Sequence, residues 1–327
     1  MKALLFLGLG LMAALPASAQ AYRETSPLAH TFSIVARDAR TGEMGVAVQS
    51  HWFSVGTVVS WGEAGVGVVA TQSFVNKSFG PRGLDLMRQG LEPAIALQRL
   101  LEDDDGKNVR QVALLDAKGR VAVHTGENCI ASAGHDSGDG FSVQANMMLN
   151  DRVVPAMKDA WLQHDNLPLA ERLLEVLKAG QAAGGDIRGK QSAALLVVRG
   201  EPTGQPWDDR LVDLRVDDAA EPIAELERLL RVHRAYDYMN LGDLHVEHGN
   251  MPAAMEAYEA AMKMFPENLE MKYWTAVTLA SNGETDKAAG MLREVYAKDP
   301  NWRELTRRLP DAGVLTLPAR EFEKLVR

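Results

Sequence analysis

The first part of the chain alternates between short apolar runs and stretches of helical period. Phe32, Ile34 and Ala36 alternate with the other positions of 31–37, Thr41 and Gly42 supply a turn, and the run 44–48 follows. This pattern predicts a β-hairpin over 31–50. The runs 55–61 and 66–70 are apolar at successive positions and rich in valine and alanine. Strands of this kind are covered on both faces. The pattern therefore predicts sheets that are buried on both sides.

The pattern then changes several times between helical and strand periods. Pro81 and Pro93 stand at the start of apolar stripes with helical spacing, which predicts two helices. A glycine-rich segment at 134–140 predicts a loop. The remaining predicted strands are 109–116, 120–124, 141–145, 192–198 and 211–216, and the remaining helices are 153–163 and 168–180. This order predicts a layered α/β sandwich with helices packed on sheets.

Beyond about residue 219 the pattern is entirely helical and contains an internal repeat. A glycine, an alanine and a proline recur at a spacing of 34 residues, at Gly249, Ala254 and Pro266 and again at Gly283, Ala288 and Pro300. The first copy also has Tyr238, Gly242 and Tyr258. These features are typical of tetratricopeptide repeats, in which small residues let two helices approach closely. We expect helices at 221–234 and 318–326 to cap two repeats; two unrelated helical hairpins are the alternative.

Residues 1–19 have the pattern of a secretory signal peptide. A single positive charge at Lys2 precedes a short apolar run, and Ala17-Ser18-Ala19 forms a small-x-small cleavage pattern. The run is too short to span a bilayer permanently. The sequence therefore predicts a periplasmic or secreted protein without a membrane anchor, in which 20–30 is a short N-terminal extension.

Composition narrows the classes of partner and cofactor. The net charge is −9, with acids and bases mixed along the chain, which argues against nucleic acid as a partner. Cys129 is the only cysteine, so no intrachain disulfide can form, and we interpret it as a small buried hydrophobic residue. The histidines lack the paired spacing of metal ligands, so we expect neither a metal nor a cofactor. A cluster of His124, His135 and Cys129 around a metal is the alternative.

Two short segments are candidates for catalysis. Thr31 begins the first strand, and a threonine that becomes a chain terminus can act as nucleophile with its own α-amine as general base. The segment 71–73 (Thr-Gln-Ser) follows an apolar run, where sites are common, and a helix N-cap with a turn is an equal alternative. No G-x-S-x-G nucleophile elbow is present. The segment 184–191 approaches a phosphate-binding loop, but Gln191 replaces the Mg²⁺-binding hydroxyl residue, which argues against nucleotide binding.

Specific short motifs are spread over most of the first domain. They are His30–Asp38, Gly45–Ser50, Ala64–Ser73, Phe79–Gly83, Gly126–Cys129, Ala133–His135, Ser142–Met147 and Gln181–Asp186. Together they resemble the family called domain of unknown function 1028. The resemblance extends over about 31–217, which we take as the first domain. Residues 218–327, with the repeats, lie outside it and form the second predicted domain.

The resemblance implies an α+β fold, a four-layer αββα sandwich of the N-terminal-nucleophile (Ntn) hydrolase type, followed here by the all-α repeat domain. It implies that Thr31 matches the nucleophile position, which in such hydrolases attacks an amide carbonyl. Backbone amides and polar side chains then stabilise the oxyanion. The residues expected at the site are Thr31, Ser73 and Asn146 for catalysis, and Gln72, Gln144, Asn76, Arg82 and His135 for substrate binding.

Two functions remain open at this point. The first is an exported amide hydrolase that acts on a small amide or peptide with Thr31 as nucleophile. Removal of residues 1–19 leaves eleven residues before Thr31, so this function requires a second cut. The second is a non-catalytic binding or scaffold protein that uses residues 235–302 to bind a protein partner. Sandwich domains of this type often pair, so we also predict a homo-oligomer.

Overall fold

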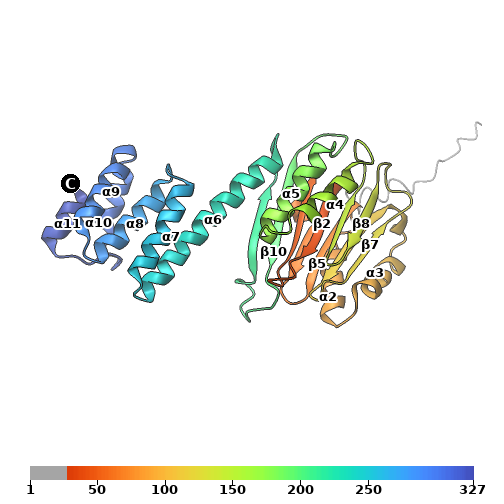
Figure 1. Ribbon diagram of the computed structural model, residues 1–327, viewed down its shortest axis with the longest axis horizontal. Coiled ribbons are helices and arrows are strands. Elements are labelled where there is room, and N and C mark those ends of the chain that lie inside the picture. Colours follow the sequence, from red (N-terminus) through yellow and green to blue (C-terminus); the bar gives the residue numbers. More distant parts are fainter. Residues whose placement is uncertain (1–27) are drawn as a thin grey trace, which may run out of the picture. The chain divides into compact units, whose positions relative to one another are not determined.

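The computed structural model describes residues 28–327, which form two compact units (Figure 1). The division falls after Glu227, inside helix α6 (Pro222–Glu247). The predicted signal peptide, 1–19, and most of the predicted extension lie outside the described residues. Within the described part, no helix is both long enough and apolar enough to cross a membrane.

The first unit contains two antiparallel sheets, of which the larger has six strands in the order β11-β10-β3-β2-β9-β8. Its strands are β2 (Thr31–Arg37), β3 (Met44–Ser50), β8 (Gly134–Gly138), β9 (Phe141–Ala145), β10 (Ser192–Val198) and β11 (Arg210–Val216). The predicted hairpin, β2 with β3, lies in the middle of this sheet and pairs Thr31 with Ser50.

The second sheet has five strands, with β1-β5-β6-β7 in order and β4 also paired to β5. Its strands are β1 (Leu28–Ala29), β4 (Ser60–Glu63), β5 (Gly67–Phe74), β6 (Arg110–Asp116) and β7 (Val121–Thr125). One edge of β5 pairs with β6, and β4 and β1 share the other edge. The ladder with β4 ends at Ala70, and the last residues of β5, Ser73 and Phe74, pair with β1.

Helices cover the outer faces of the two sheets, which face each other (Figure 1). The six-stranded sheet packs against α4 (Val153–Gln163) and α5 (Leu169–Ala182), and the five-stranded sheet against α2 (Phe79–Arg88) and α3 (Pro93–Glu102). A Cβ at Gly80 would lie 2.3 Å from the Trp61 side chain, so glycine is needed for α2 to approach β4. The mixed α+β architecture with two packed sheets agrees with the prediction.

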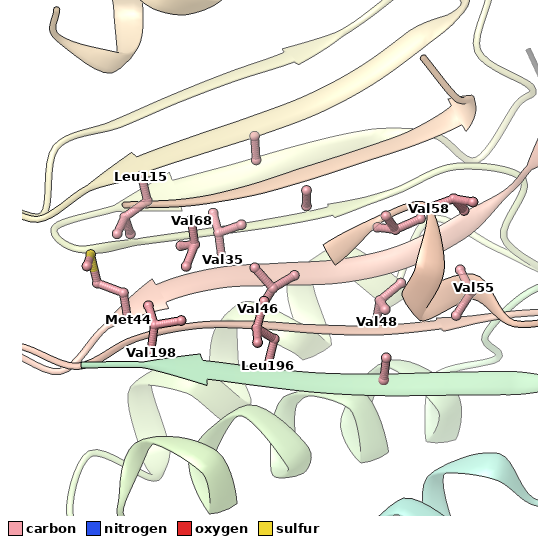
Figure 2. Close-up of a cluster of buried hydrophobic side chains, with 14 of the residues drawn as sticks. Val35, Met44, Val46, Val48, Val55, Val58, Val68, Leu115, Leu196 and Val198 are labelled. Atoms are coloured by element: carbon pink, nitrogen blue, oxygen red, sulfur yellow. The ribbon is translucent and has the colours of Figure 1, made fainter. Parts of the chain in front are cut away.

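The central apolar core lies between the two sheets (Figure 2). Val46 and Val48 of β3 and Leu196 of β10 project from one sheet, and Val68 of β5 and Leu115 of β6 project from the other. Each of these side chains is at most 4% exposed. Burying a valine or leucine side chain stabilises a fold by roughly 1.5–3 kcal/mol relative to exposure. This layer is therefore a major source of stability for the first unit.

Two predicted elements are wrong in type. Only the end of 55–61 is a strand: the run begins as a 3₁₀ turn, η1 (Val55–Thr57), and enters β4 at Ser60. A second such turn is η2 (Lys107–Val109). The valines of the run are buried in the core, so its apolar character indicates burial without a strand. The segment 134–140 is largely not a loop, because its backbone pairs with β9 as the edge strand β8.

Two element boundaries also differ from the prediction. Residues 71–73 lie inside β5, so the N-cap alternative for them is wrong. The helix predicted at 221–234 as a separate cap continues without interruption to Glu247 as α6. The domain boundary at 217 stays a prediction; β11 ends at Val216, and the compact units divide eleven residues later, after Glu227.

The second unit is all helical. Besides the rest of α6 it contains α7 (Met251–Met264), α8 (Leu269–Ser281), α9 (Thr285–Lys298), α10 (Asn301–Arg308) and α11 (Ala319–Val326). The repeated glycines, Gly249 and Gly283, have left-handed φ values of 71° and 88° just past the ends of α6 and α8, a conformation that favours glycine. A Cβ at Gly242 would lie 2.3 Å from the Tyr258 ring, so this glycine permits the expected close helix approach.

Candidate active site

The layer between the sheets changes from apolar to polar along its strands. At one end the inward side chains form the core, and toward the other end they are polar and equally buried. The changes run from Val35 to Ser33 and Thr31 on β2, Val48 to Ser50 on β3, Ala70 to Gln72 on β5, Ala113 to Gln111 on β6, and Ala194 to Ser192 on β10. The polar cluster is defined as Thr31, Ser33, Ser50, Gln72, Gln111, Ser142, Gln144 and Asn146.

Five side chains of the polar cluster form a chain of hydrogen bonds in which each one donates to the next. Ser142 Oγ donates to Gln144 Oε1 (2.9 Å), and Gln144 Nε2 donates to Ser33 Oγ (2.6 Å). Ser33 Oγ donates to Gln72 Oε1 (2.6 Å), and Gln72 Nε2 donates to Gln111 Oε1 (2.7 Å). Matching donors to acceptors in this way offsets the cost of burying polar groups. The amides of Gln72 and Gln144, which we expected at the substrate, thus have protein partners.

Thr31 begins β2 and is completely buried. Strand alternation places it on the same face as Ser33, toward the other sheet. Its carbonyl oxygen accepts hydrogen bonds from the backbone nitrogen of Asn146 (3.1 Å) and from Gln72 Nε2 (3.2 Å). Its nitrogen is joined to His30 in a peptide bond, so the described chain offers no α-amine at Thr31.

Two side chains hold the carbonyl oxygen of His30, which belongs to the peptide bond with Thr31. Ser50 Oγ donates to it at 2.5 Å and Arg188 Nη2 at 2.9 Å. Arg188 is oriented by Asp186, because its Nε and Nη2 donate to the two carboxylate oxygens at 3.0 and 2.7 Å. The Asp186 side chain is completely buried. The arrangement polarises the His30 carbonyl as an oxyanion hole does.

The His30 side chain is enclosed, with 1% of the residue exposed. Its Nδ1 lies 2.8 Å from Asn146 Oδ1, and its ring meets Phe74 in a T-shaped pair with centroids 5.7 Å apart. Nδ1 carries the proton, because an amide oxygen can only accept. No residue from 28 to 327 bonds to Nε2. Burial lowers the pKa of His30, and the bond to Asn146 offsets only part of this, so the imidazole is neutral at pH 7.

Ser73 lies at the end of β5 in an uncommon backbone conformation. Its φ is 71°, in the left-handed region that disfavours serine. Its hydroxyl is buried and has no hydrogen bond of ordinary geometry within residues 28–327. Cys129 is nearby and only partly buried; burial raises the pKa of its thiol, and the Ser73 hydroxyl counters part of the rise. Cys129 is therefore a neutral thiol at pH 7, not a nucleophilic thiolate.

Two residues that we expected to bind substrate lie away from the polar cluster. Asn76 closes the turn before α2, where its Oδ1 accepts a hydrogen bond from the backbone nitrogen of Ser78 (3.1 Å). Arg82, on α2, is 44% exposed in its side chain and forms an ion pair with Asp103 at 2.7 Å. Both have local structural partners, and the structure does not bring them to Thr31.

His135 lies at the exposed rim of the polar cluster, on β8. Its Nδ1 is 2.8 Å from Thr125 Oγ1, which accepts a hydrogen bond from Gln111 Nε2 at 2.8 Å. Although the residue is exposed, partial desolvation of its ring lowers its pKa, and the nearby His124 adds to this. Across residues 28–327, no three histidine, cysteine, aspartate or glutamate side chains are grouped as ligands for a metal.

Sequence reasoning missed four residues that surround the His30–Thr31 bond: His30 itself, Ser50, Asp186 and Arg188. Ser50 could have been found from the predicted hairpin, because its register places Ser50 opposite Thr31. Asp186 and Arg188 stand in the glycine-rich segment 184–191, which we considered only as a phosphate-binding loop. A loop has no periodicity, so nothing in the local pattern shows which of its side chains point inward.

An open groove of about 420 Å³ lies elsewhere on the first unit. Trp61 and Glu63 of β4, Arg88 of α2 and Arg215 of β11 contribute to its lining. Its charges are paired, as Arg88 donates to Glu63. None of the lining residues belongs to the polar cluster, so the groove is not part of the candidate active site.

Comparisons with known proteins agree with the two-unit organisation. The model described as "Family of unknown function (DUF1028)" matches residues 31–226, and a tetratricopeptide-repeat model matches residues 239–301. The crystal structure of protein SPO2555 from Silicibacter pomeroyi, which carries the same DUF1028 description, is 32% identical over 62% of this chain and 85% of that chain, with a TM-score of 0.56. None of the curated proteins matches. Both resemblances noted in the sequence are confirmed.

Proposed function

The chain belongs to the DUF1028 family, whose function is unknown, and from the geometry around Thr31 we propose that it is an amide hydrolase. In this proposal Thr31 is the nucleophile, and the chain first cleaves its own His30–Thr31 bond. An Ntn-hydrolase-like αββα sandwich is part of the proposal, supported by the two facing sheets with helices on their outer faces. Since fold likeness alone does not establish a reaction, the argument rests on the site.

The pair of donors on the His30 carbonyl carries the proposal. Ser50 Oγ and Arg188 Nη2 contact this oxygen at 2.5 and 2.9 Å. When a nucleophile attacks the carbonyl carbon, negative charge develops on the same oxygen, and donors that are already in place stabilise it. An ordinary backbone carbonyl needs only one partner, which is usually a backbone amide. A hydroxyl together with an arginine held by a buried aspartate is more than the fold requires here.

Self-cleavage needs only groups that are adjacent in the chain. The Thr31 hydroxyl oxygen attacks the carbonyl carbon of His30, the C–N bond breaks, and the acyl group moves to the oxygen as an ester. The hydroxyl proton ends on the Thr31 nitrogen. Water then hydrolyses the ester, which leaves a carboxylate on His30 and frees the Thr31 hydroxyl and α-amine. This amine, with an ordinary pKa of about 8, can serve as general base.

The freed Thr31 would then attack the amide of a small amide or peptide substrate at the same place. Ser50 and Arg188 would hold the substrate carbonyl as they hold that of His30. Asn146 and Gln72 act as positioning residues in this proposal, because they donate to the Thr31 carbonyl. Gln144 supports Gln72 through Ser33.

Two substitutions of Thr31 test the proposal. Full-length protein is incubated after purification, and loss of the N-terminal segment is followed by intact mass. Thr31→Ala lacks the hydroxyl and should stay uncut, whereas Thr31→Ser keeps a hydroxyl and should be cut. Thr57→Ala, which changes an exposed threonine in η1, is the control and should be cut like the unchanged chain. Cutting of Thr31→Ala at the native rate would contradict the proposal.

We also propose that the protein is exported to the periplasm or beyond, on the pattern of residues 1–19. Cell fractionation followed by N-terminal mass spectrometry tests this directly. The exported fraction should begin at Gln20 when only the signal peptide has been removed, and at Thr31 when self-cleavage has followed. Protein that keeps residues 1–19 and stays in the cytoplasmic fraction would contradict export.

For the second unit we propose the binding of a protein partner, which needs no chemistry at Thr31. The tetratricopeptide match supports this, as do Tyr238, Leu241 and Leu244 of α6, which are 42%, 41% and 46% exposed. Their spacing of three residues places them along one side of the helix. Leu241→Glu should abolish co-purification of the partner, while the exposed control Arg293→Glu should retain it. If the partner is a second copy of the chain, Leu241→Glu should instead halve the mass measured by light scattering. Equal behaviour of Leu241→Glu and Arg293→Glu would contradict the proposal that these exposed residues of α6 bind the partner.

A further inference from the structure

The strand that precedes the cleavage site occupies an edge of β5. Leu28 of β1 lies opposite Phe74, and Ala29 lies opposite Ser73, in antiparallel pairing. The ladder between β4 and β5 ends at Ala70, so β1 continues this edge of the sheet. When the segment leaves, its backbone partners on β5 become unpaired. An unpaired strand edge binds extended peptides by strand addition, through main-chain hydrogen bonds.

The side chain of His30, the residue directly before the His30–Thr31 bond, fills an enclosed pocket that suits a flat, uncharged ring. Phe74 meets the His30 ring at an interplanar angle of 90°, and Asn146 Oδ1 accepts from its Nδ1. Edge-to-face contact of this kind is specific to aromatic rings. A carboxylate there would face the amide oxygen of Asn146. The nearby cation, Arg188, is already paired with the buried Asp186, so burying a second carboxylate is costly.

The carbonyl that follows this ring is the one held by Ser50 and Arg188. Three parts of a substrate-binding site are thus filled by consecutive residues of the chain itself: a strand edge by β1, a ring pocket by the His30 side chain, and the carbonyl donors by the His30 backbone. Nothing in this arrangement depends on the residues being part of the same chain as Thr31.

We propose that residues 28–30 are bound as the acyl half of a substrate, and that the substrate class is an extended peptide with histidine or another aromatic residue directly before the scissile amide. This inference rests on the proposed amide hydrolysis at Thr31. The chemistry is the same acyl transfer to the Thr31 hydroxyl, with an amine as leaving group and water as the second reactant. The segment that ends at His30 is then the first substrate and afterwards a product that competes with later ones.

Variants at position 30 of the full-length chain test the ring pocket through self-cleavage. His30→Phe keeps the ring contact with Phe74 and should be cut within about tenfold of the native rate. His30→Ala loses the ring pair and the bond to Asn146 and should be cut roughly 30-fold more slowly. His30→Asp should be slower again. His164→Ala removes a partly buried histidine whose Nδ1 lies 2.9 Å from the Ala160 carbonyl, and as the control should be cut at the native rate.

Substrates added to the cleaved, otherwise unchanged protein keep the inference testable if a position-30 variant does not fold. The probes are p-nitroanilides of Leu-Ala-His, Leu-Ala-Phe and Leu-Ala-Asp. The first two should be hydrolysed at least tenfold faster than the third, and a synthetic peptide of residues 20–30 should raise KM without lowering kcat.

The two proposals fail in different ways. A chain that never cuts itself in any form overturns the hydrolase and with it the substrate assignment. Cutting whose rate is the same for every residue at position 30, with anilides hydrolysed equally well, overturns only the substrate assignment and leaves the hydrolase standing.

Discussion

The layer between the two sheets has an apolar half and a polar half, although the same strands build both. In the apolar half, Val46, Val48 and Leu196 pack against Val68 and Leu115 (Figure 2). In the polar half, the inward positions further along the same strands hold the residues of the polar cluster. Alternation along each strand is unchanged between the halves, so they differ only in which side chains occupy the inward positions. One framework thus separates the part that stabilises the fold from the part that surrounds Thr31.

The polar half is a less stable way to fill the same space. Its buried groups gain little from the hydrophobic effect, and each must find a partner to avoid a net cost. The hydrogen-bond chain from Ser142 to Gln111 meets that requirement. Among the buried polar atoms of residues 28–327 that have no partner are His30 Nε2, beside the His30–Thr31 bond, and Ser73 Oγ, beside the strand β1. A buried polar atom without a partner, or a serine held in the left-handed region as Ser73 is, calls for an explanation, and a functional site is one.

The apolar half should respond to truncation with the largest loss of stability. Leu115→Ala leaves a cavity between the sheets and should lower the free energy of unfolding by about 2–5 kcal/mol in a urea titration. Leu162→Ala is the control, because Leu162 is 56% exposed on α4, and should change it by less than about 0.5 kcal/mol. Self-cleavage of folded Leu115→Ala should keep its native rate. A selective loss of cleavage in that variant would break the separation of the two halves.

The polar half should respond to loss of a carbonyl donor with slower chemistry. Arg188→Met removes one of the two donors on the His30 oxygen and should slow self-cleavage by about 10²–10³-fold, which corresponds to roughly 3–4 kcal/mol of barrier. The exposed Arg199→Met is the matched control and should leave the rate unchanged. The time course of intact mass measures both. Equal rates for the two variants would show that Arg188 only holds the segment in place.

Replacing a polar residue in the polar half by an apolar one, or an apolar residue in the apolar half by a polar one, should destabilise the fold. Gln72→Leu removes the acceptor of the Ser33 hydroxyl and one of the two donors to Gln111 Oε1, and should cost about 1–3 kcal/mol of unfolding free energy. Val48→Thr places a hydroxyl in the apolar half at nearly constant volume and should cost about the same. Only Gln72→Leu should also slow self-cleavage, since Gln72 donates to the Thr31 carbonyl. If Gln72→Leu changed neither the free energy of unfolding nor the rate of self-cleavage, the hydrogen bonds of Gln72 would contribute neither to stability nor to the position of Thr31.

The smallest expected effect is the dependence of stability on pH that comes from His30. Because burial lowers the pKa of His30 in the folded chain, the unfolded chain takes up a proton first as the pH falls through about 6.5. Uncut protein such as Thr31→Ala should therefore lose stability between pH 7 and pH 5.5. Adding His30→Phe to Thr31→Ala removes this titration and should flatten the dependence, whereas adding His164→Ala should not. An unchanged slope in the His30→Phe double variant would contradict the buried neutral ring.

The framework of the first unit could be predicted because its elements have strong local patterns. The hairpin pattern over 31–50 and the buried run 192–198 correspond to observed strands, and Pro93 marks the start of α3. Where local composition and long-range pairing disagreed, pairing prevailed: 134–138 is a strand because β9 supplies its partners. The valines of 55–61 are buried because of their position between the sheets, and their β propensity does not make a strand of them.

The candidate site could be predicted only in part, since its geometry depends on residues that are distant in sequence. Thr31 and the segment 71–73, with Gln72, were candidates from their place in the sequence, and Asn146 was added by the family resemblance. The structure brings these three residues together. The orientation of the Gln72 amide depends on Ser33 and Gln111, which come from other strands. The role of a loop residue such as Arg188 becomes visible only when the loop and the hairpin meet. No local pattern contains that information.

The identity of the residue at the new N-terminus tests the central claim most directly. Full-length protein is incubated at neutral pH, and both the protein and any released peptide are analysed by mass spectrometry. We predict a protein that begins at Thr31 with a free amine, together with a peptide that ends at His30 with a free carboxylate. A folded chain that still carries His30 joined to Thr31 after prolonged incubation would contradict the claim that this end of the layer is a hydrolase site.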